Sequence, residues 1–205
     1  RVASRGLGDV YKRQAFIAGQ LYEALGKTSK ARESYKICLS GQPDSYDMLL
    51  EANLRKALNA NSKRLDLYKE LERLLKEPKN KQYGDRIYFA LAEVAKKRKD
   101  VDQQLYFLSR GIGLGITERP NLKAIAYYDR GEIFFNQKKY PPSQVNYDSA
   151  YILLPKNHPL KRSLKNKTKG LNNLVAEIEK IQRNDSLLSL SGKSETFLEA
   201  YFLKY

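Results

Sequence analysis

The chain has 205 residues, of which 41% are hydrophobic, and its 38 Lys and Arg residues exceed its 23 Asp and Glu residues by 15. It can therefore bury a core, but its single Cys excludes an internal disulfide and its single His excludes a histidine cluster for a metal. No apolar run approaches the ~20 residues that a membrane-spanning helix needs.

The first 14 residues, RVASRGLGDVYKRQ, are interpreted as non-native. Residues 4–14 resemble the translation of a transposase adaptor used to prepare sequencing libraries. We therefore expect the native part to begin near Ala15, and we leave residues 1–14 out of the fold prediction.

Residues 15–43 predict a hairpin of two short helices. The residues that set its spacing are Gly19, Tyr22, Ala31, Tyr35, Cys38 and Pro43. Cys38 stands where two helices pack closely, so we expect a buried thiol rather than a nucleophile. Gly26-Lys27-Thr28 is expected to be the turn between the helices, since a phosphate-binding loop would need a glycine where Leu21 stands.

Residues 45–78 predict a degenerate hairpin, with apolar stripes interrupted at 59–62. Residues 82–111 predict a better one, in which Ala92 and Leu108 take the places of Gly19 and Tyr35. The turn at 96–99 contains four consecutive basic residues, which favours a solvated turn, with contact to an acidic partner as the alternative. The glycines at 111, 113 and 115 are expected to end the second helix.

Residues 124–155 give the clearest hairpin. Gly131, Ser143, Tyr147, Ala150 and Pro155 repeat the spacing of residues 15–43, and Pro141 and Pro142 fit the first turn of the second helix. The pattern resembles the tetratricopeptide repeat (TPR), in which a glycine on the first helix faces a large residue on the second. We therefore predict an all-α TPR superhelix over 15–155, with about four antiparallel hairpins and a longer C-terminal helix.

After Pro155 the composition becomes basic. Residues 156–190 are expected to form a basic segment followed by a helix whose apolar residues fit a short heptad pattern; those residues are Leu171, Leu174, Ile178, Ile181 and Leu188. This helix is expected either to cap the array or to form a coiled coil. Residues 191–205 read as the truncated start of a further helix.

Surface positions provide the candidate sites. In the TPR register, the groove-facing places of three first helices are held by Phe16, Gln20, Glu23, Phe89, Glu93, Lys96, Tyr128, Glu132 and Phe135. The aromatic residues at equivalent places are a candidate peptide-binding stripe. The alternative is that these rings pack between adjacent repeats. A second candidate is the basic set Lys161, Arg162, Lys165, Lys167 and Lys169.

The order of segments resembles a more specific family. KEPKNKQYGDRIYFALAEVA, followed later by LLPKNHP and IQRNDSLL, is similar to the TPR lipoproteins of the type IX secretion and gliding-motility apparatus of Bacteroidetes, the PorW/SprE group. The resemblance implies a lipid-anchored scaffold at the periplasmic face of the outer membrane, whose partners are secretion-machine components. It implies no catalytic residue, cofactor, metal or small-molecule substrate. A cytoplasmic location is the alternative if the resemblance misleads.

Two other classes of function are weighed against this scaffold. The sequence shows no paired carboxylates, metal-ligand spacing or nucleophile–base pattern, so we do not expect an enzyme. The basic charge raises the alternatives of a generic TPR adaptor for an acidic peptide and of a nucleic-acid-binding repeat protein. The dispersed basic residues favour an acidic protein partner or anionic lipid over nucleic acid.

Overall fold

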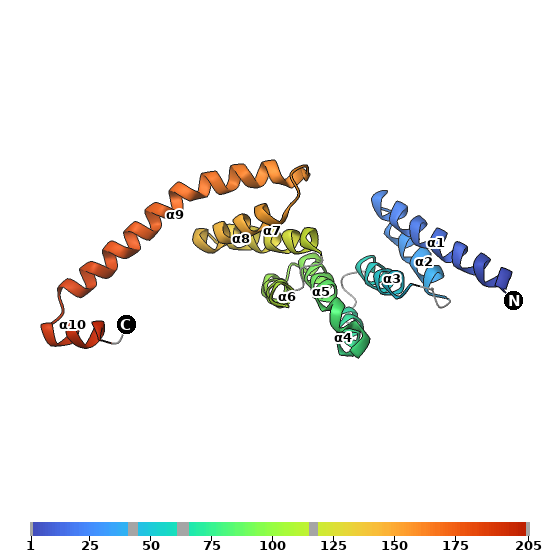
Figure 1. Cartoon of the computed structure of the whole chain (residues 1–205), viewed down its shortest axis with the longest axis horizontal. Coiled ribbons are helices and arrows are strands. Elements are labelled where there is room, and N and C mark those ends of the chain that lie inside the picture. The colour runs from blue at the N-terminus through green and yellow to red at the C-terminus, as the bar shows by residue number, and fades with distance from the viewer. Residues whose placement is uncertain (1, 41–44, 61–65, 115–118, 204–205) are drawn as a thin grey trace. The chain divides into compact units, whose positions relative to one another are not determined.

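The computed structural model describes residues 2–40, 45–60, 66–114 and 119–203, and the elements in these ranges are all helices (Figure 1). The all-α class is therefore confirmed, while the TPR subtype stays a prediction. Three sequence assignments lie outside the described residues: the helix-ending Pro43, part of the break at 59–62, and Gly115.

The chain divides into two units, Arg1–Arg119 and Pro120–Tyr205, and each is described by itself. The helices of the first unit are α1 (Val2–Ala24), α2 (Thr28–Leu39), α3 (Tyr46–Leu58), α4 (Leu67–Lys76), the 3₁₀-helix η1 (Pro78–Tyr83), α5 (Gly84–Arg98) and α6 (Val101–Gly113). Because α1 packs on α2 and α5 on α6, the hairpins expected near 15–43 and 82–111 are formed. The segment interpreted as adaptor-derived continues into α1 without a break.

The middle of the first unit is less regular. Helix α3 packs mainly on α2, and α4 packs mainly on α5, so these two helices hardly form a hairpin with each other. The 3₁₀-helix η1 is not signalled by any apolar period in the sequence. It is fixed by the buried Asn80, whose amide donates to the Leu74 carbonyl at 2.8 Å and accepts from the Tyr46 hydroxyl at 2.5 Å.

The second unit consists of α7 (Pro120–Asn136), α8 (Tyr140–Leu153), α9 (Pro159–Ser191) and α10 (Glu195–Phe202). Helices α7 and α8 form the predicted hairpin, and the first half of α9 packs on α8, as the capping alternative predicts. The buried residues of α9 are Leu164, Leu171 and Val175. Most of the heptad stripe is not covered by the described residues: Ile181 is 57% exposed and Leu188 is 70% exposed.

A glycine facing a ring sets the close approach in each hairpin. An ideal Cβ on Gly19 would lie 2.6 Å from the Tyr35 ring, and one on Gly131 would lie 2.7 Å from the Tyr147 ring. In the α5–α6 hairpin the roles are reversed, because an ideal Cβ on Gly111 of the second helix would lie 2.5 Å from the Phe89 ring of the first. Helix α6 ends at Gly113, within the glycine-containing stretch 111–115 where its end was predicted.

The inter-helix turns of three hairpins have the same backbone conformation. Gly26, Lys99 and Lys138 have φ of 68°, 60° and 60°, and each follows its first helix in the left-handed region. The next amide in each turn donates back to a carbonyl five residues earlier, as Lys139 does to Phe134 at 2.9 Å. This is the Schellman ending of a helix, so the three hairpins share one register.

Small and polar residues complete the interiors of the hairpins. Cys38 is fully buried, as predicted, and burial raises the pKa of its thiol above the ordinary value. Ser143 on α8 stands at the position that corresponds to Ala31 on α2. Its hydroxyl donates to the Gly131 carbonyl at 3.0 Å. Helix–helix contact at these positions therefore depends on side-chain size rather than on any reactive group.

Candidate functional site

The predicted aromatic stripe packs largely within the hairpins. Phe16 lies edge-on to Tyr35 with ring centroids 5.8 Å apart, and Tyr128 lies 6.1 Å from Tyr147. Phe89 is only 8% exposed, because Gly111 leaves room for its ring. Each of these rings therefore contacts the second helix of its own hairpin.

The other groove positions differ in exposure. Gln20 is exposed, and Glu93 and Lys96 form an exposed pair with 3.6 Å between the Lys96 Nζ and a Glu93 carboxylate oxygen. Phe135 is 42% exposed, with its ring edge-on to that of Tyr140 at 5.8 Å. These four predicted positions remain accessible to a partner.

Glu23 is engaged within the first unit instead. Its carboxylate accepts from the Arg55 guanidinium at 2.5 Å and from the Asn59 amide, both on or next to α3. The buried Tyr35 hydroxyl lies close by, and burial together with the Glu23 carboxylate raises the pKa of Tyr35 above its ordinary value. Glu23 therefore fixes α3 against the first hairpin rather than facing solvent.

The contact between Glu23 and Arg55 extends to one further helix, α5. Arg55 also donates to Glu51 at 2.7 Å, and Glu51 in turn pairs with Arg86 of α5. Arg86 reaches Asp47 at 2.6 Å. Burial alone would raise the pKa of Glu51, but hydrogen bonds and charge from Arg86 and Arg55 hold it below the ordinary value. This network connects α1, α3 and α5.

Glu132 is engaged in the same manner in the second unit. The Tyr147 hydroxyl donates to its carboxylate, and the Lys167 ammonium of α9 pairs with it. The Lys167 nitrogen also lies 5.2 Å from the Tyr128 ring centroid and 5.1 Å from that of Tyr147. Burial and the Glu132 carboxylate raise the pKa of Tyr147.

We call each such group of a tyrosine, a glutamate and a later cation a tyrosine–glutamate–cation cluster. The first cluster consists of Tyr35, Glu23 and Arg55, and the second of Tyr147, Glu132 and Lys167.

Both clusters use the same register position. Arg55 follows Tyr35 by twenty residues, and Lys167 follows Tyr147 by twenty. Sequence reasoning did not single out Arg55, although this equal spacing is the signal that could have found it. In the hairpin where Leu108 replaces the tyrosine, the residue twenty positions later is Tyr128, which is not a cation.

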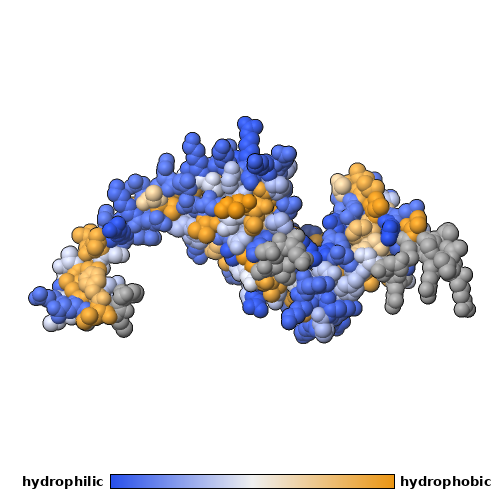
Figure 2. Space-filling view, viewed as in Figure 1, coloured by the Kyte–Doolittle hydropathy of each residue, from blue (hydrophilic) through white to orange (hydrophobic). Residues whose placement is uncertain are grey.

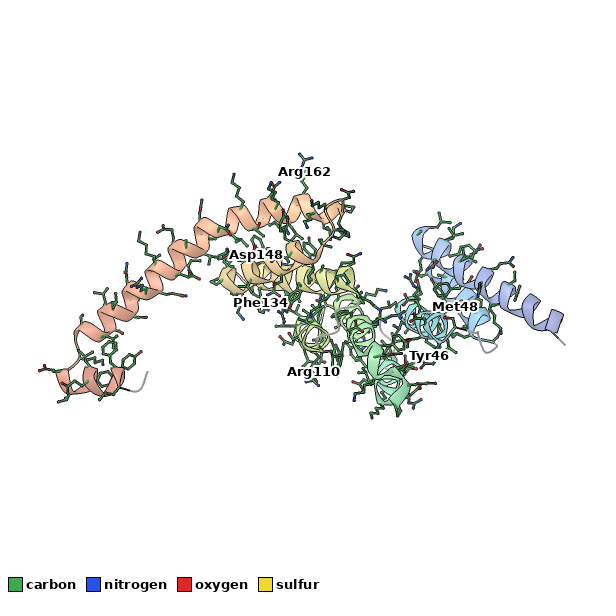
Figure 3. All side chains as sticks on the ribbon, in the orientation of Figure 1. Tyr46, Met48, Arg110, Phe134, Asp148 and Arg162 are labelled. Carbon is green, nitrogen blue, oxygen red and sulfur yellow. The ribbon has the colours of Figure 1, made fainter. Side chains whose placement is uncertain are left out.

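The basic set on α9 separates into engaged and exposed members. Lys161 donates to the Leu154 carbonyl and its ammonium nitrogen lies 4.7 Å from the Tyr151 ring centroid. It therefore caps the C-terminal end of α8. Arg162, Lys165 and Lys169 are exposed instead. Figure 3 shows Arg162 pointing away from α8, and Figure 2 shows a hydrophilic surface over this part of α9.

The described residues contain no group of three or more His, Cys, Asp or Glu side chains that could hold a metal ion. Within the same residues, no helix combines the length and the apolar character that crossing a membrane requires. The described side chains offer ion pairs, hydrogen bonds and aromatic surface, which are the contacts of a binding surface.

The fold and these surfaces define an all-helical protein of helical-repeat character. Comparison with protein-family models finds no match, and comparison with curated proteins finds no significant relative.

Proposed function

We propose that the chain is a non-catalytic protein–protein interaction scaffold. The observation that carries this proposal is the shared register of three hairpins, each with the same left-handed turn residue and a close glycine–ring contact. Arrays of such hairpins present equivalent positions of successive helices as an extended binding surface. In the first unit the accessible positions are Gln20, Glu93 and Lys96, and in the second unit, taken by itself, the accessible position is Phe135.

The finer proposal is that the scaffold belongs to the type IX secretion and gliding-motility apparatus, where it holds machine components together at the periplasmic side of the outer membrane. Its support is the similarity of two sequence stretches, residues 76–95 and the succession from residue 153 to 188. The first covers η1 and most of α5, and the second runs from the end of α8 to near the end of α9. The anchoring lipid and the location follow from the resemblance alone.

A pull-down from a Bacteroidetes envelope extract tests both levels of this proposal. The bait is the chain itself, beside a variant carrying Glu93→Arg and Phe135→Ser. Both changes lie at accessible first-helix positions, so the fold should tolerate them. A matched control carries Val145→Ser and Ile152→Ser, which are 64% and 76% exposed on the second helix α8.

Recovery of secretion-machine components by the chain and the control, with loss in the first variant, supports the scaffold and its first-helix surface. Equal recovery by all three baits would move the interaction away from that surface. Recovery that contains no secretion-machine component would overturn the finer proposal. All baits are compared for helicity by circular dichroism, so that a lost interaction is not a lost fold.

The exposed cations on α9 favour a second candidate, an acidic protein partner. Residues 156–176 contain no acidic residue, and Arg162, Lys165 and Lys169 share the exposed side of the helix. Charge reversal of these three to Glu should abolish capture of such a partner and its sensitivity to salt. The control is Lys180→Glu with Arg183→Glu, further along the exposed part of α9. Capture of nucleic acid alone, weakening steeply with salt, would replace this candidate.

A further inference from the structure

An open hollow of ≈ 720 Å³ lies in the first unit, on the side of Asn59. Its walls come from one side of α2, the end of α3 and the end of α5. The lining residues are Thr28, Ser29, Arg32, Glu33, Lys36, Leu58, Asn59, Ala60 and Lys97. Three of these residues are cationic and one is acidic, so the lining carries an excess of two positive charges.

Arg32 leaves a hydrogen-bond donor unused at this hollow. Its Nε–H is buried from solvent and has no hydrogen-bond partner in the described structure. A buried donor without a partner costs free energy, so the Arg32 side chain gains from a shift that brings this donor to an acceptor in the hollow. A guanidinium offers several donors in a planar fork, a geometry that matches a carboxylate or a phosphate.

Two lysines add positive charge around this donor. Lys36 pairs with Glu33 at 2.9 Å, which satisfies the one acidic residue of the lining. Lys97 donates to the Leu58 carbonyl, and its ammonium has further protons to offer. Helix α2 also begins here, and the Lys27 side chain before it makes no capping hydrogen bond in the described chain. The first backbone N–H groups of α2 therefore add to the positive potential.

We propose that this hollow is an oxyanion-binding site that takes a carboxylate or phosphate group, with Arg32 as its main ligand. The inference goes beyond the scaffold function, since it concerns a small polar site rather than the surface of the first helices. The group binds to Arg32 by charge-assisted hydrogen bonds, and Lys97 and the first amides of α2 complete its surroundings. The volume of the hollow exceeds that of a bare phosphate ion, so it can also admit an anion carried on a larger molecule.

Titration of the full chain with inorganic phosphate, followed by NMR, is the first test. At constant ionic strength we expect saturable shifts of the Thr28 and Ser29 amides and of the Arg32 Nε–H resonance. In Arg32→Met the apparent Kd should rise by about tenfold or more, because the charge-assisted bonds are lost. In the control Lys165→Met, which removes an exposed charge on α9, binding should be unchanged.

The Arg32→Met variant should fold, because the Nε–H that it removes has no partner in the described structure. Its far-ultraviolet circular dichroism and thermal midpoint should match those of the parent chain. Shifts that do not saturate, that chloride reproduces at equal ionic strength, or that persist unchanged in Arg32→Met would overturn the proposal.

A second titration distinguishes the sources of the oxyanion. A short peptide of alternating Glu and Gly and its phosphoserine counterpart are compared with inorganic phosphate, using the same three resonances. Tighter binding of a peptide identifies a protein-borne anion, and binding of phosphate alone identifies a small free anion. Both outcomes retain the Arg32 site, whereas failure of all three ligands removes it.

Discussion

Replacing Gly131 by Ala tests the idea that the absence of a side chain sets the contact between α7 and α8. An ideal Cβ at this position would lie 2.7 Å from both Cδ1 and Cε1 of Tyr147. Carbon atoms in normal contact are about 3.5–4.0 Å apart, so the overlap is about 1 Å. The ring cannot move away freely, because Tyr147 is fully buried and its hydroxyl binds Glu132.

The expected magnitude is the sum of two opposed terms. Overpacking of a closed interior costs about 1–3 kcal/mol, and an overlap of this size against a fixed ring belongs at the upper end. Alanine in a helix interior is more favourable than glycine by about 1 kcal/mol. We therefore expect Gly131→Ala to lower the free energy of unfolding by about 2 kcal/mol.

Gly170→Ala provides the matched control on α9, where an added Cβ meets nothing within 4 Å. Only the helix-propensity term applies there, so this variant should be more stable by about 1 kcal/mol. Urea unfolding followed by far-ultraviolet circular dichroism measures both variants against the parent chain. A difference between the two variants below about 1 kcal/mol would refute the close-approach argument.

Three further predictions concern the turns and the polar clusters. Lys138→Gly should stabilise the chain by about 0.5–1 kcal/mol in urea unfolding, because glycine adopts the left-handed conformation of that turn without strain, whereas an alanine there should give no such gain. The free energy of unfolding should fall as the pH drops below about 4.5, because the Glu51 carboxylate, whose pKa is lowered in the fold, stabilises the fold only while it is ionised. In acid unfolding curves, Glu51→Gln should make that fall less steep. Tyr35 and Tyr147 should be the last tyrosines to ionise in an alkaline absorbance titration, because the pKa of each is raised. The free energy of unfolding should decrease above about pH 10, where these two tyrosines lose their protons in the unfolded chain but retain them in the folded chain. Ionisation of all the tyrosines together in the folded chain would contradict this.

The features that the sequence predicts well are those that depend on local spacing. Gly131 and Tyr147, sixteen residues apart, recur as Gly19 and Tyr35, and this spacing alone identifies both hairpins and their closest contacts. Periodicity also locates the buried Cys38, because a small residue was expected where two helices meet. These predictions hold because each rests on helix geometry within one hairpin.

The features that sequence reasoning missed depend on long-range pairing or on backbone conformation. Phe89 was expected in a groove, but the missing side chain at Gly111 lets its ring become buried. The sequence pattern predicted a groove position for Glu23, because its partner Arg55 lies 32 positions later and helical periodicity does not reveal such a distant contact. A lysine gives no sequence signal for the left-handed conformation, so the strain at Lys99 was not foreseen.

The tyrosine–glutamate–cation clusters limit how freely the hairpins can be rearranged. A hairpin that carries Tyr147 and Glu132 needs a following helix with a cation at the place of Lys167. If that helix instead presents an apolar residue there, the glutamate loses its cation and the apolar side chain meets a carboxylate. Duplication or shuffling of single hairpins would therefore destabilise the product, whereas exchange of a hairpin together with its following helix would preserve every pair.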